Sequence, residues 1–494
     1  MKAQYEMRAG LEIHVQLKVA AKLFCTCDFS FAAEPNSCVC PVCLGYPGAL
    51  PVLNGAAVAQ AVKAGLMLGC EINSVSSFDR KNYFYPDAAK NYQITQNFNP
   101  LCRGGAIEIQ VGDGEVREIG LTRIHLEEDV AKSVHHGDCS GIDFNRAGVA
   151  LIEIVTRPEI TSADEAVAVL TALKELLLYA GVSDCNLEEG NMRCDVNMSL
   201  KHCGVAELGT KVEIKNINTI SGVQAALRYE ARRQGDILAG GGSVEQETRR
   251  WDAETGKTVA MRAKEDAPDY RYMAEPDLPQ LGVTAAEVAR LGSELPEAPA
   301  KRRIRLVEQY GIPAYDAGVI TGSRFLADFF EESAGLCGNG KVVSNWIMTD
   351  VLHLVGAHGV AIEASRISPV ELAELINLVN SGTINAATGK ELLEEIFLQG
   401  GTPTTMVESR GLGQISDAAM LEDLVAAAMA DNPNSVNDWL AGKKAAAGFL
   451  VGQVMKRSRG KADPKLVGKL IEVSLNGIRT DCVTTAECGK GEHQ

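Results

Sequence analysis

The feature that most constrains this chain is a strict alternation of apolar and polar residues over positions 10–17. A period of two is typical of a half-buried β-strand, because successive side chains point to opposite faces. The polar face of this strand would carry Glu12, His14 and Gln16. A carboxylate, an imidazole and an amide in one row suit a cation or a phosphate-rich ligand. The alternative is an ordinary strand whose polar face is exposed to solvent, which has the same pattern.

The alternation recurs in residues 121–129, 192–199 and 211–218. Each segment again gathers polar side chains on one face, namely Arg123, His125 and Glu127, then Arg193, Asp195, Asn197 and Ser199, then Lys211, Glu213 and Lys215. The first of these strands ends in three adjacent acids, which repel one another unless water or a cation neutralises them. A solvated turn and a Mg²⁺ site are the two interpretations of that triplet.

Together the four polar faces are typical of the floor of an open cleft that binds metal and phosphate. The sequence has no GxxxxGK[ST] motif, and no GxGxxG motif follows a predicted strand. Neither a P-loop nor a Rossmann site therefore explains such a cleft.

A separate signal lies in two cysteine-rich turns. Cys25 and Cys27 form one pair, and Cys40 and Cys43 form the other. Two pairs of thiolates separated by a short loop are what a tetrahedral Zn²⁺ site needs. Cys38 is a fifth thiol nearby, so the spacing leaves open which four would bind, and free buried cysteines are the alternative. With sulfur in every position, such a site would be structural.

Composition sets the broad class. A length of 494 residues allows about three domains, and 46% hydrophobic residues supply their cores. The formal charge of −16 means that nucleic-acid binding would need a local basic patch. The first residues lack the apolar stretch of a secretory signal, and charged or polar residues interrupt the long apolar runs. We therefore expect a cytoplasmic protein with no membrane span and with reduced cysteines.

Short-range patterns predict amphipathic helices at residues 56–70 and after Ser162, a buried strand at 151–155 and a hairpin at 246–264. Residues 78–93 mix cations, amides and tyrosines. Such mixtures are common at sites for anionic, stacking ligands, although a surface loop is the default.

Beyond about residue 278 the pattern is helical, and residues 400–403 are the best linker candidate. Between residues 442 and 470, eight basic residues stand against the single acid Asp463. This local reversal of charge is the most plausible place for a nucleic-acid backbone to bind, with a solvated helix face as the alternative. The eight are Lys443, Lys444, Lys456, Arg457, Arg459, Lys461, Lys465 and Lys469. Residues 479–494 show no periodicity and are expected to be disordered.

Six motifs in one order along the chain resemble the B subunit of the tRNA-dependent amidotransferase. They lie at residues 10–14, 78–87, 123–129, 193–197, 246–250 and 448–456. The resemblance implies that the chain uses ATP to phosphorylate the side-chain carboxylate of Glu mischarged on tRNA(Gln), or of Asp on tRNA(Asn). Ammonia released by an amidase A subunit then displaces the phosphate, and a small C subunit holds the other two together. A non-discriminating synthetase is a further implied partner.

The resemblance also implies an α+β fold. A cradle domain with a largely antiparallel, glutamine-synthetase-like sheet would occupy residues 1–290 and contain the zinc knuckle at residues 25–43. A helical domain would follow at residues 291–402, and a helical tRNA-binding tail domain at residues 403–478. The chain has no room for the large domain inserted in the archaeal E-type relative, which favours the bacterial or organellar B type.

Individual residues receive roles by the same resemblance. The implied Mg²⁺ ligands are Glu12, His14, Glu128 and Asp195, with Glu213 as a further acidic member of the site. Arg249 and Arg250 are expected to contact the phosphates of ATP. The resemblance implies that Cys25, Cys27, Cys40 and Cys43 bind a structural Zn²⁺. It also implies that the basic residues of the tail bind tRNA.

Two alternatives stay open. A stand-alone ATP-dependent carboxylate–amine ligase would not need the basic tail. A zinc-stabilised RNA-binding protein without catalysis would give the acids on the strand faces no chemical role. The sequence has no Ser-Ser-Lys amidase signature, so we expect that the isolated chain cannot hydrolyse glutamine.

Overall fold

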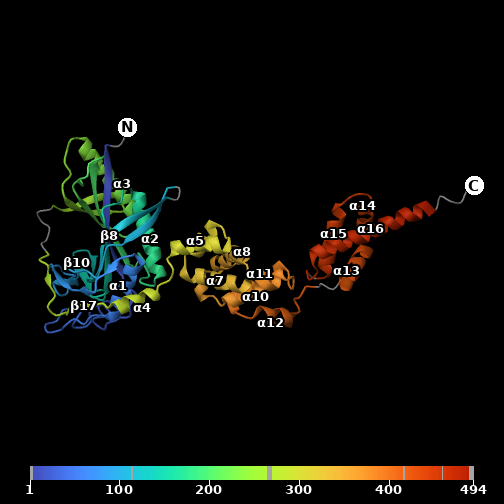
Figure 1. The fold of residues 1–494 in the computed structure, drawn as a ribbon, viewed down its shortest axis with the longest axis horizontal. Helices are drawn as coiled ribbons and strands as arrows, with labels where there is room; N and C mark the ends of the chain where they lie inside the picture. The colour runs from blue at the N-terminus through green and yellow to red at the C-terminus, as the bar shows by residue number, and fades with distance from the viewer. Residues whose placement is uncertain are drawn as a thin grey trace, which may run out of the picture. The chain divides into compact units, whose positions relative to one another are not determined.

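The computed structural model describes residues 4–112, 115–187, 189–263, 270–414, 418–458 and 460–488. The chain divides into two compact units, Met1–Pro299 and Ala300–Gln494. The first unit combines a large sheet with a few helices, and the second is helical (Figure 1). The predicted α+β class is confirmed.

The first unit is built on a ten-stranded sheet with the order β15-β14-β13-β12-β1-β11-β8-β6-β2, in which β7 also pairs with β8. The strands are β1 (Tyr5–Gln16), β2 (Glu71–Ile72), β6 (Cys102–Arg103), β7 (Ala106–Val111), β8 (Glu115–Glu128), β11 (Ala150–Thr156), β12 (Met192–His202), β13 (Val212–Ile217), β14 (Glu247–Asp252) and β15 (Lys257–Ala263). Every described pair in this sheet is antiparallel except β13 with β14.

The opening strand of the sequence pattern is thus the central strand β1. Leu11, Ile13 and Val15 are buried in the core of the first unit. The helices α1 (Gly55–Met67), α2 (Ala163–Tyr179) and α3 (Ile220–Ala239) contribute their apolar residues to the same core. Because helices cover one face of the sheet, the polar side chains of β1 are left on the other face.

Short elements complete the first unit. A three-stranded sheet joins β4 (Asp79–Asn82), β5 (Tyr92–Thr95) and β16 (Met273–Ala274). Two small pairs join β3 (Val75–Ser76) with β17 (Leu281–Gly282), and β9 (Lys132–His136) with β10 (Cys139–Asp143). The last helix of this unit is α4 (Ala285–Ser293).

The second unit contains two hydrophobic clusters, one within residues 306–407 and one within residues 421–475. Its helices are α5 (Pro299–Tyr310), α6 (Ala314–Ile320), α7 (Arg324–Cys337), α8 (Gly340–Trp346), α9 (Leu352–His358), α10 (Pro369–Asn380), α11 (Ala386–Gln399), α12 (Pro403–Arg410), α13 (Ala418–Asp431), α14 (Pro433–Leu440), α15 (Ala445–Arg457) and α16 (Pro464–Cys488). A π-helical turn, Ile347–Val351, joins α8 to α9.

Two predictions about this unit need correction. The linker at residues 400–403 does not separate the cores, because Met406 and Val407 of α12 are buried in the first cluster. Part of the tail predicted to be disordered, residues 479–488, is helical and belongs to α16, and this stretch contains neither glycine nor proline to end the helix. The rest of that prediction, residues 489–494, lies outside the described residues. The described helices include none that is long and apolar enough to span a membrane.

Candidate active site

The antiparallel register gathers the polar side chains of neighbouring strands, since directly opposed residues point to the same face. Glu12 lies opposite Asp195 of β12, and His14 lies opposite Glu153 of β11. Glu153 in turn lies opposite His125 of β8. Residues far apart in sequence therefore share one surface of the sheet.

His14, Glu127 and Glu153 form a compact group on this surface, with one potential ligand atom from each lying within 4.8 Å of the others. His14 Nε2 is 3.7 Å from Glu127 Oε1 and 3.8 Å from Glu153 Oε2. Mg²⁺ in nucleotide sites is bound by one or two carboxylates and keeps its other positions for water and phosphate. Two carboxylates and one imidazole therefore fit a divalent cation that also contacts a nucleotide.

Hydrogen bonds fix the orientation of the two carboxylates. Gln93 Nε2 donates to Glu127 Oε1 at 2.6 Å, and Thr95 Oγ1 donates to Glu127 Oε2 at 2.9 Å. His125, which is buried, places its Nε2 3.0 Å from Glu153 Oε2. Contacts of this kind hold metal-binding carboxylates in a productive geometry.

Both carboxylates are held in the charged form. Burial by itself raises a carboxyl pKa, but the Lys81 ammonium and the two histidines lower the pKa of Glu127 below its ordinary value. Burial likewise opposes ionisation of Glu153, and its contact with His125 lowers the pKa of that carboxyl. Lys81 remains protonated, because the attraction of Glu127 outweighs burial and raises the pKa of the ammonium.

A second row of acids lies beside this group. Asn197 Nδ2 donates to Glu12 Oε1 at 2.8 Å. Lys215 Nζ is 3.0 Å from Asp195 Oδ2 and 2.9 Å from Glu213 Oε1. Burial and two neighbouring carboxylates raise the pKa of Glu12. Lys215 thus neutralises part of this row.

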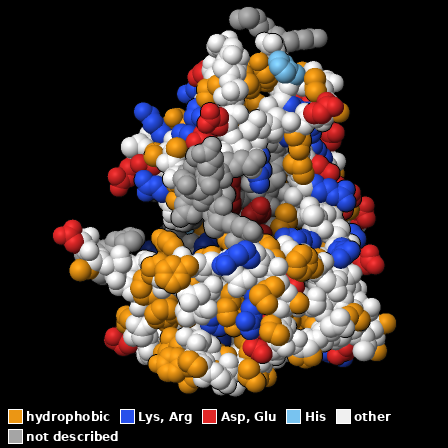
Figure 2. All heavy atoms as spheres, turned by 90° about the vertical axis from the view of Figure 1, so that its left-hand side faces the viewer, with side chains coloured by type: hydrophobic (Ala, Val, Ile, Leu, Met, Phe, Trp, Pro, Cys, Tyr) orange, Lys and Arg blue, Asp and Glu red, His pale blue; other side chains and the backbone are white. Residues whose placement is uncertain are grey.

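The two rows line one cavity of about 510 Å³. Its basic lining residues are Lys81, Arg123, Lys211 and Lys215. Figure 2 shows this side of the first unit, where acidic side chains lie recessed near the centre of the face. A polar cavity of this size and mixed charge is suited to a nucleotide with its metal.

The acidic triplet at the end of β8 is neither a solvated turn nor a single metal site, because its three members are buried and contact different partners. Only Glu127 reaches the cavity. Glu128 lies on the opposite face of the strand, where its Oε1 accepts from Lys90 Nζ at 2.5 Å. Asp129 Oδ1 accepts from Arg193 Nη2 at 2.8 Å.

The predicted Mg²⁺ set is therefore only partly assembled. Within the described part of the chain, His14 is the only one of the four that belongs to a metal-sized group, meaning a cluster whose potential ligand atoms are close enough together to hold one metal ion. Glu12 and Asp195 line the same cavity, as does Glu213. Glu128 does not line the cavity, because adjacent residues of a strand point to opposite faces and Glu127 faces the cavity.

The two arginines expected at phosphate do not line the cavity. Arg249 is committed to the sheet: its Nη1 is 2.8 Å from Glu247 Oε1, and its Nε donates to Thr258 Oγ1 at 2.8 Å. Thr258 Oγ1 donates in turn to Glu230, which is fully buried, and Arg249 Nε lies 3.6 Å from the same carboxylate. Arg250 is exposed on β14. Arg249 thus makes its contacts within the first unit and away from the cavity lining.

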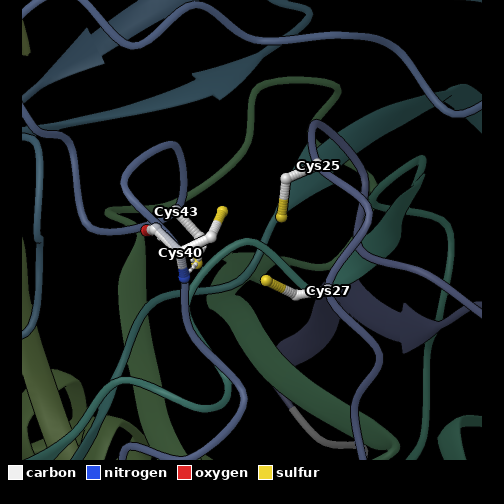
Figure 3. A group of neighbouring side chains, drawn as sticks. All are labelled: Cys25, Cys27, Cys40 and Cys43. Carbon is white, nitrogen blue, oxygen red and sulfur yellow. Dashed lines mark hydrogen bonds between the residues drawn. The ribbon is translucent and has the colours of Figure 1, made fainter.

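The four predicted zinc ligands form the other metal-sized group among the described residues. The sulfurs of Cys25 and Cys27 point toward the loop that carries Cys40 and Cys43 (Figure 3). Cys43 Sγ lies 3.9 Å from Cys40 Sγ. Zn–S bonds of about 2.3 Å in a tetrahedron separate the sulfurs by about 3.8 Å. The four thiols therefore match the geometry of a zinc site.

Local contacts favour a thiolate at Cys43, whereas the hydrogen bond to Cys43 raises the pKa of the Cys25 thiol and burial raises that of the Cys27 thiol. The Cys40 amide donates to Cys43 Sγ at 3.1 Å, and the buried Lys22 places its Nζ 3.6 Å from the same sulfur. The hydrogen bond from Cys25, together with these contacts, lowers the pKa of Cys43. Gly45 completes the turn at a φ of +68°, where a Cβ would lie 2.5 Å from a side-chain atom of Lys90. Cys38 lies outside the group.

The basic residues of the tail differ in whether they already contact another residue of the chain. Lys443 contacts Asp438 at 2.9 Å, and Arg457 is paired with Asp431. Lys461 Nζ donates to the Gly411 carbonyl at 2.6 Å. The exposed residues without such a partner, within the described part of the tail, are Lys444, Lys456, Lys465 and Lys469. Arg459 lies outside the described residues.

Sequence reasoning missed Glu153, and it did not assign Glu127 or Lys81. Glu153 is the only polar residue in the predicted buried strand at 151–155, and a lone carboxylate in an apolar run was the available signal. Glu127 already shared a predicted strand face with His125. Lys81 falls in the segment predicted to hold an anionic ligand, but no pattern distinguished it from its neighbours.

Comparison with known proteins identifies the family. The family model of the GatB/GatE catalytic domain matches residues 7–289, and that of the GatB domain matches residues 328–475. The B subunit of the aspartyl/glutamyl-tRNA(Asn/Gln) amidotransferase of Moorella thermoacetica is 49% identical over 476 residues, which cover 96% of this chain and 100% of that protein. Its counterpart in Carboxydothermus hydrogenoformans is 47% identical over 477 residues, covering 96% and 99%. The chain therefore belongs to the family of the aspartyl/glutamyl-tRNA(Asn/Gln) amidotransferase B subunits.

Proposed function

We propose that this chain is the ATP-using subunit of a tRNA-dependent amidotransferase. It phosphorylates the side-chain carboxylate of Glu on tRNA(Gln), of Asp on tRNA(Asn), or of both, and then converts the acyl phosphate to the amide. Ammonia comes from an amidase A subunit, and a small C subunit completes the assembly. Family membership over nearly the whole chain supports this reaction.

The observation that carries the proposal is the group formed by His14, Glu127 and Glu153, all three of which line the cavity. In this proposal the three side chains hold Mg²⁺, which when bound offsets the negative charge between ATP and the substrate carboxylate. Lys81 and Lys215 face the same space and can contact phosphate oxygens. In this proposal Glu12, Asp195 and Glu213 lie around the Mg²⁺ site and are not its direct ligands.

The chemistry requires such a site. A carboxylate does not accept ammonia directly, because its leaving group would be oxide. Phosphorylation supplies phosphate as the leaving group, and the cavity brings together the charges that this step needs. Structural Zn²⁺ on Cys25, Cys27, Cys40 and Cys43 is part of the proposal, as is tRNA binding by the exposed lysines of the tail.

The proposal is tested by reconstituting the chain with A and C subunits and offering Glu-tRNA(Gln) and Asp-tRNA(Asn) with ATP and glutamine. We expect amide formation on at least one tRNA, with one ATP consumed for each amide. The chain alone should not hydrolyse glutamine. Amidation without ATP consumption, or tRNA binding with no amidation in any combination, would contradict the proposal.

A further inference from the structure

Two tyrosines form one side of the catalytic cavity. Tyr270 and Tyr272 both line it, with ring centroids 6.0 Å apart. Phe98, which is largely exposed, packs edge-on against Tyr272 with the centroids 6.4 Å apart. These three residues are called the aromatic wall below. The reaction steps described above give the wall no role.

The backbone between the tyrosines is strained. Arg271 has a φ of +44°, in the left-handed region that residues with a Cβ rarely adopt. Strain of this kind persists only where the surrounding structure enforces it, and it clusters at ligand sites.

Only part of the wall is free for a ligand. Lys81 Nζ already lies over the Tyr270 ring, 5.1 Å from its centroid. Lys81 also faces Glu127 of the metal-sized group. The cavity thus presents aromatic rings, then a cation, then the candidate metal ligands. A nucleotide has the matching order of base, phosphate and metal.

Hydrogen-bonding groups stand beside the wall. Asn97 lines the cavity, and its backbone amide donates to Asp79 Oδ2 at 2.8 Å. Its carbonyl accepts from Arg123 Nη1 at 3.3 Å, so the backbone is fixed on both sides. No hydrogen bond within the described residues engages its side-chain amide. An asparagine amide donates and accepts in the pattern that an adenine edge requires.

We propose that the aromatic wall and Asn97 bind an adenine ring, which stacks on Tyr272 beside Phe98 and is contacted at its edge by Asn97. This deepens the proposed function and rests on it, since ATP and the 3′ end of tRNA both carry adenosine. Aromatic side chains stack on nucleotide bases and on single-stranded RNA ends alike.

The test uses the full chain assembled with its A and C subunits. Tyr272→Leu removes the stacking ring, Tyr272→Phe keeps it, and Asn97→Ala removes the edge contact. Phe84→Leu is the matched control, because Phe84 is 89% exposed and does not line the cavity. Two quantities are measured for each variant: the Kd of MgADP by calorimetry, and the KM for the charged tRNA. Thermal unfolding checks that each variant is folded.

Stacking on one ring contributes about 1–3 kcal/mol, so Tyr272→Leu should weaken binding about 5- to 150-fold. A higher Kd for MgADP with an unchanged tRNA KM assigns the adenine to ATP. A higher KM for tRNA with an unchanged MgADP Kd assigns it to the RNA terminus, and removal of the terminal adenosine should then abolish the difference between Tyr272→Leu and wild type. Tyr272→Phe should resemble wild type in both assays.

The proposal fails if Tyr272→Leu and Asn97→Ala change neither quantity by more than Phe84→Leu does. It also fails if Tyr272→Phe is as impaired as Tyr272→Leu, because stacking would then not be the interaction. Failure of the proposed function gives a different result: the wild-type assembly would form no amide, while the MgADP measurements would still decide whether the wall binds a base.

Discussion

The two metal-sized groups of the first unit differ in how their members come together. The four cysteines lie within nineteen positions of one another, on two neighbouring turns. His14, Glu127 and Glu153 come from three strands, and the register of the sheet brings them together. Sulfur fills all four positions of the first group, whereas the second opens onto a cavity of about 510 Å³. A group that fills every coordination position of a metal suits a structural site, whereas a group that leaves positions open suits a catalytic site.

The comparison explains why one set was predicted in full and the other only in part. Spacing along the chain limits which cysteines can meet, because a short loop holds both pairs. Spacing says nothing about strands that are more than a hundred residues apart. There, one position along a strand decides whether a carboxylate faces the cavity, as Glu127 does, or the other side, as Glu128 does.

Substitution within the open group should have the largest effect. Glu153→Gln removes an anionic ligand and should lower the rate of amide formation about 10³-fold, while the protein stays folded. Amide formation and Mg²⁺ affinity are measured together. Glu118→Gln, which changes an exposed carboxylate on β8, is the control. A Glu153→Gln enzyme with normal activity would show that the open group is not the catalytic metal site.

Disruption of the closed group should reduce stability instead of catalysis. Cys40→Ser should release one zinc per chain and lower the free energy of unfolding by about 3 kcal/mol. The Tm of the first unit should then fall by roughly 5–10 °C. Zinc content and thermal unfolding are measured, with Cys38→Ser as the matched control. Equal zinc loss in Cys38→Ser would contradict the assignment of the four ligands.

Arg249 distinguishes a structural role from a role in phosphate binding. Arg249→Gln leaves the buried Glu230 with fewer partners and should destabilise the protein by about 2 kcal/mol. The KM for ATP should stay within about twofold of wild type, because Arg249 does not line the cavity. Unfolding and steady-state kinetics are compared. A large rise in KM with unchanged stability would instead indicate that Arg249 contacts the phosphates of ATP.

The exposed tail lysines should give the smallest effect and involve neither metal group. Lys456→Ala should weaken tRNA binding about three- to tenfold and reduce the slope of log affinity against log salt by about one. Lys443→Ala should do less, because Lys443 already contacts Asp438. Filter binding at several salt concentrations measures both. Equal effects of the two substitutions would show that the tail does not use its unpaired lysines selectively.

The sequence alone determined the features that depend on local spacing. The alternation at residues 10–17 predicted β1 and its polar face, and Ser162 caps the helix α2 that was predicted to follow it. The cysteine pairs predicted their group because each pair lies on one tight turn. The long colinear motifs predicted the family.

Tertiary structure decided which polar residues meet. Glu153 joins His14 because β11 lies beside β1, and sequence order does not specify that neighbour. Arg249 and Arg250 are adjacent in sequence, but the pleat sends one toward the buried Glu230 and leaves the other exposed. The sequence specifies the functional group that each side chain carries. The partners that set its charge and orientation are fixed only when the strands pair, because pairing depends on the packing of the whole sheet.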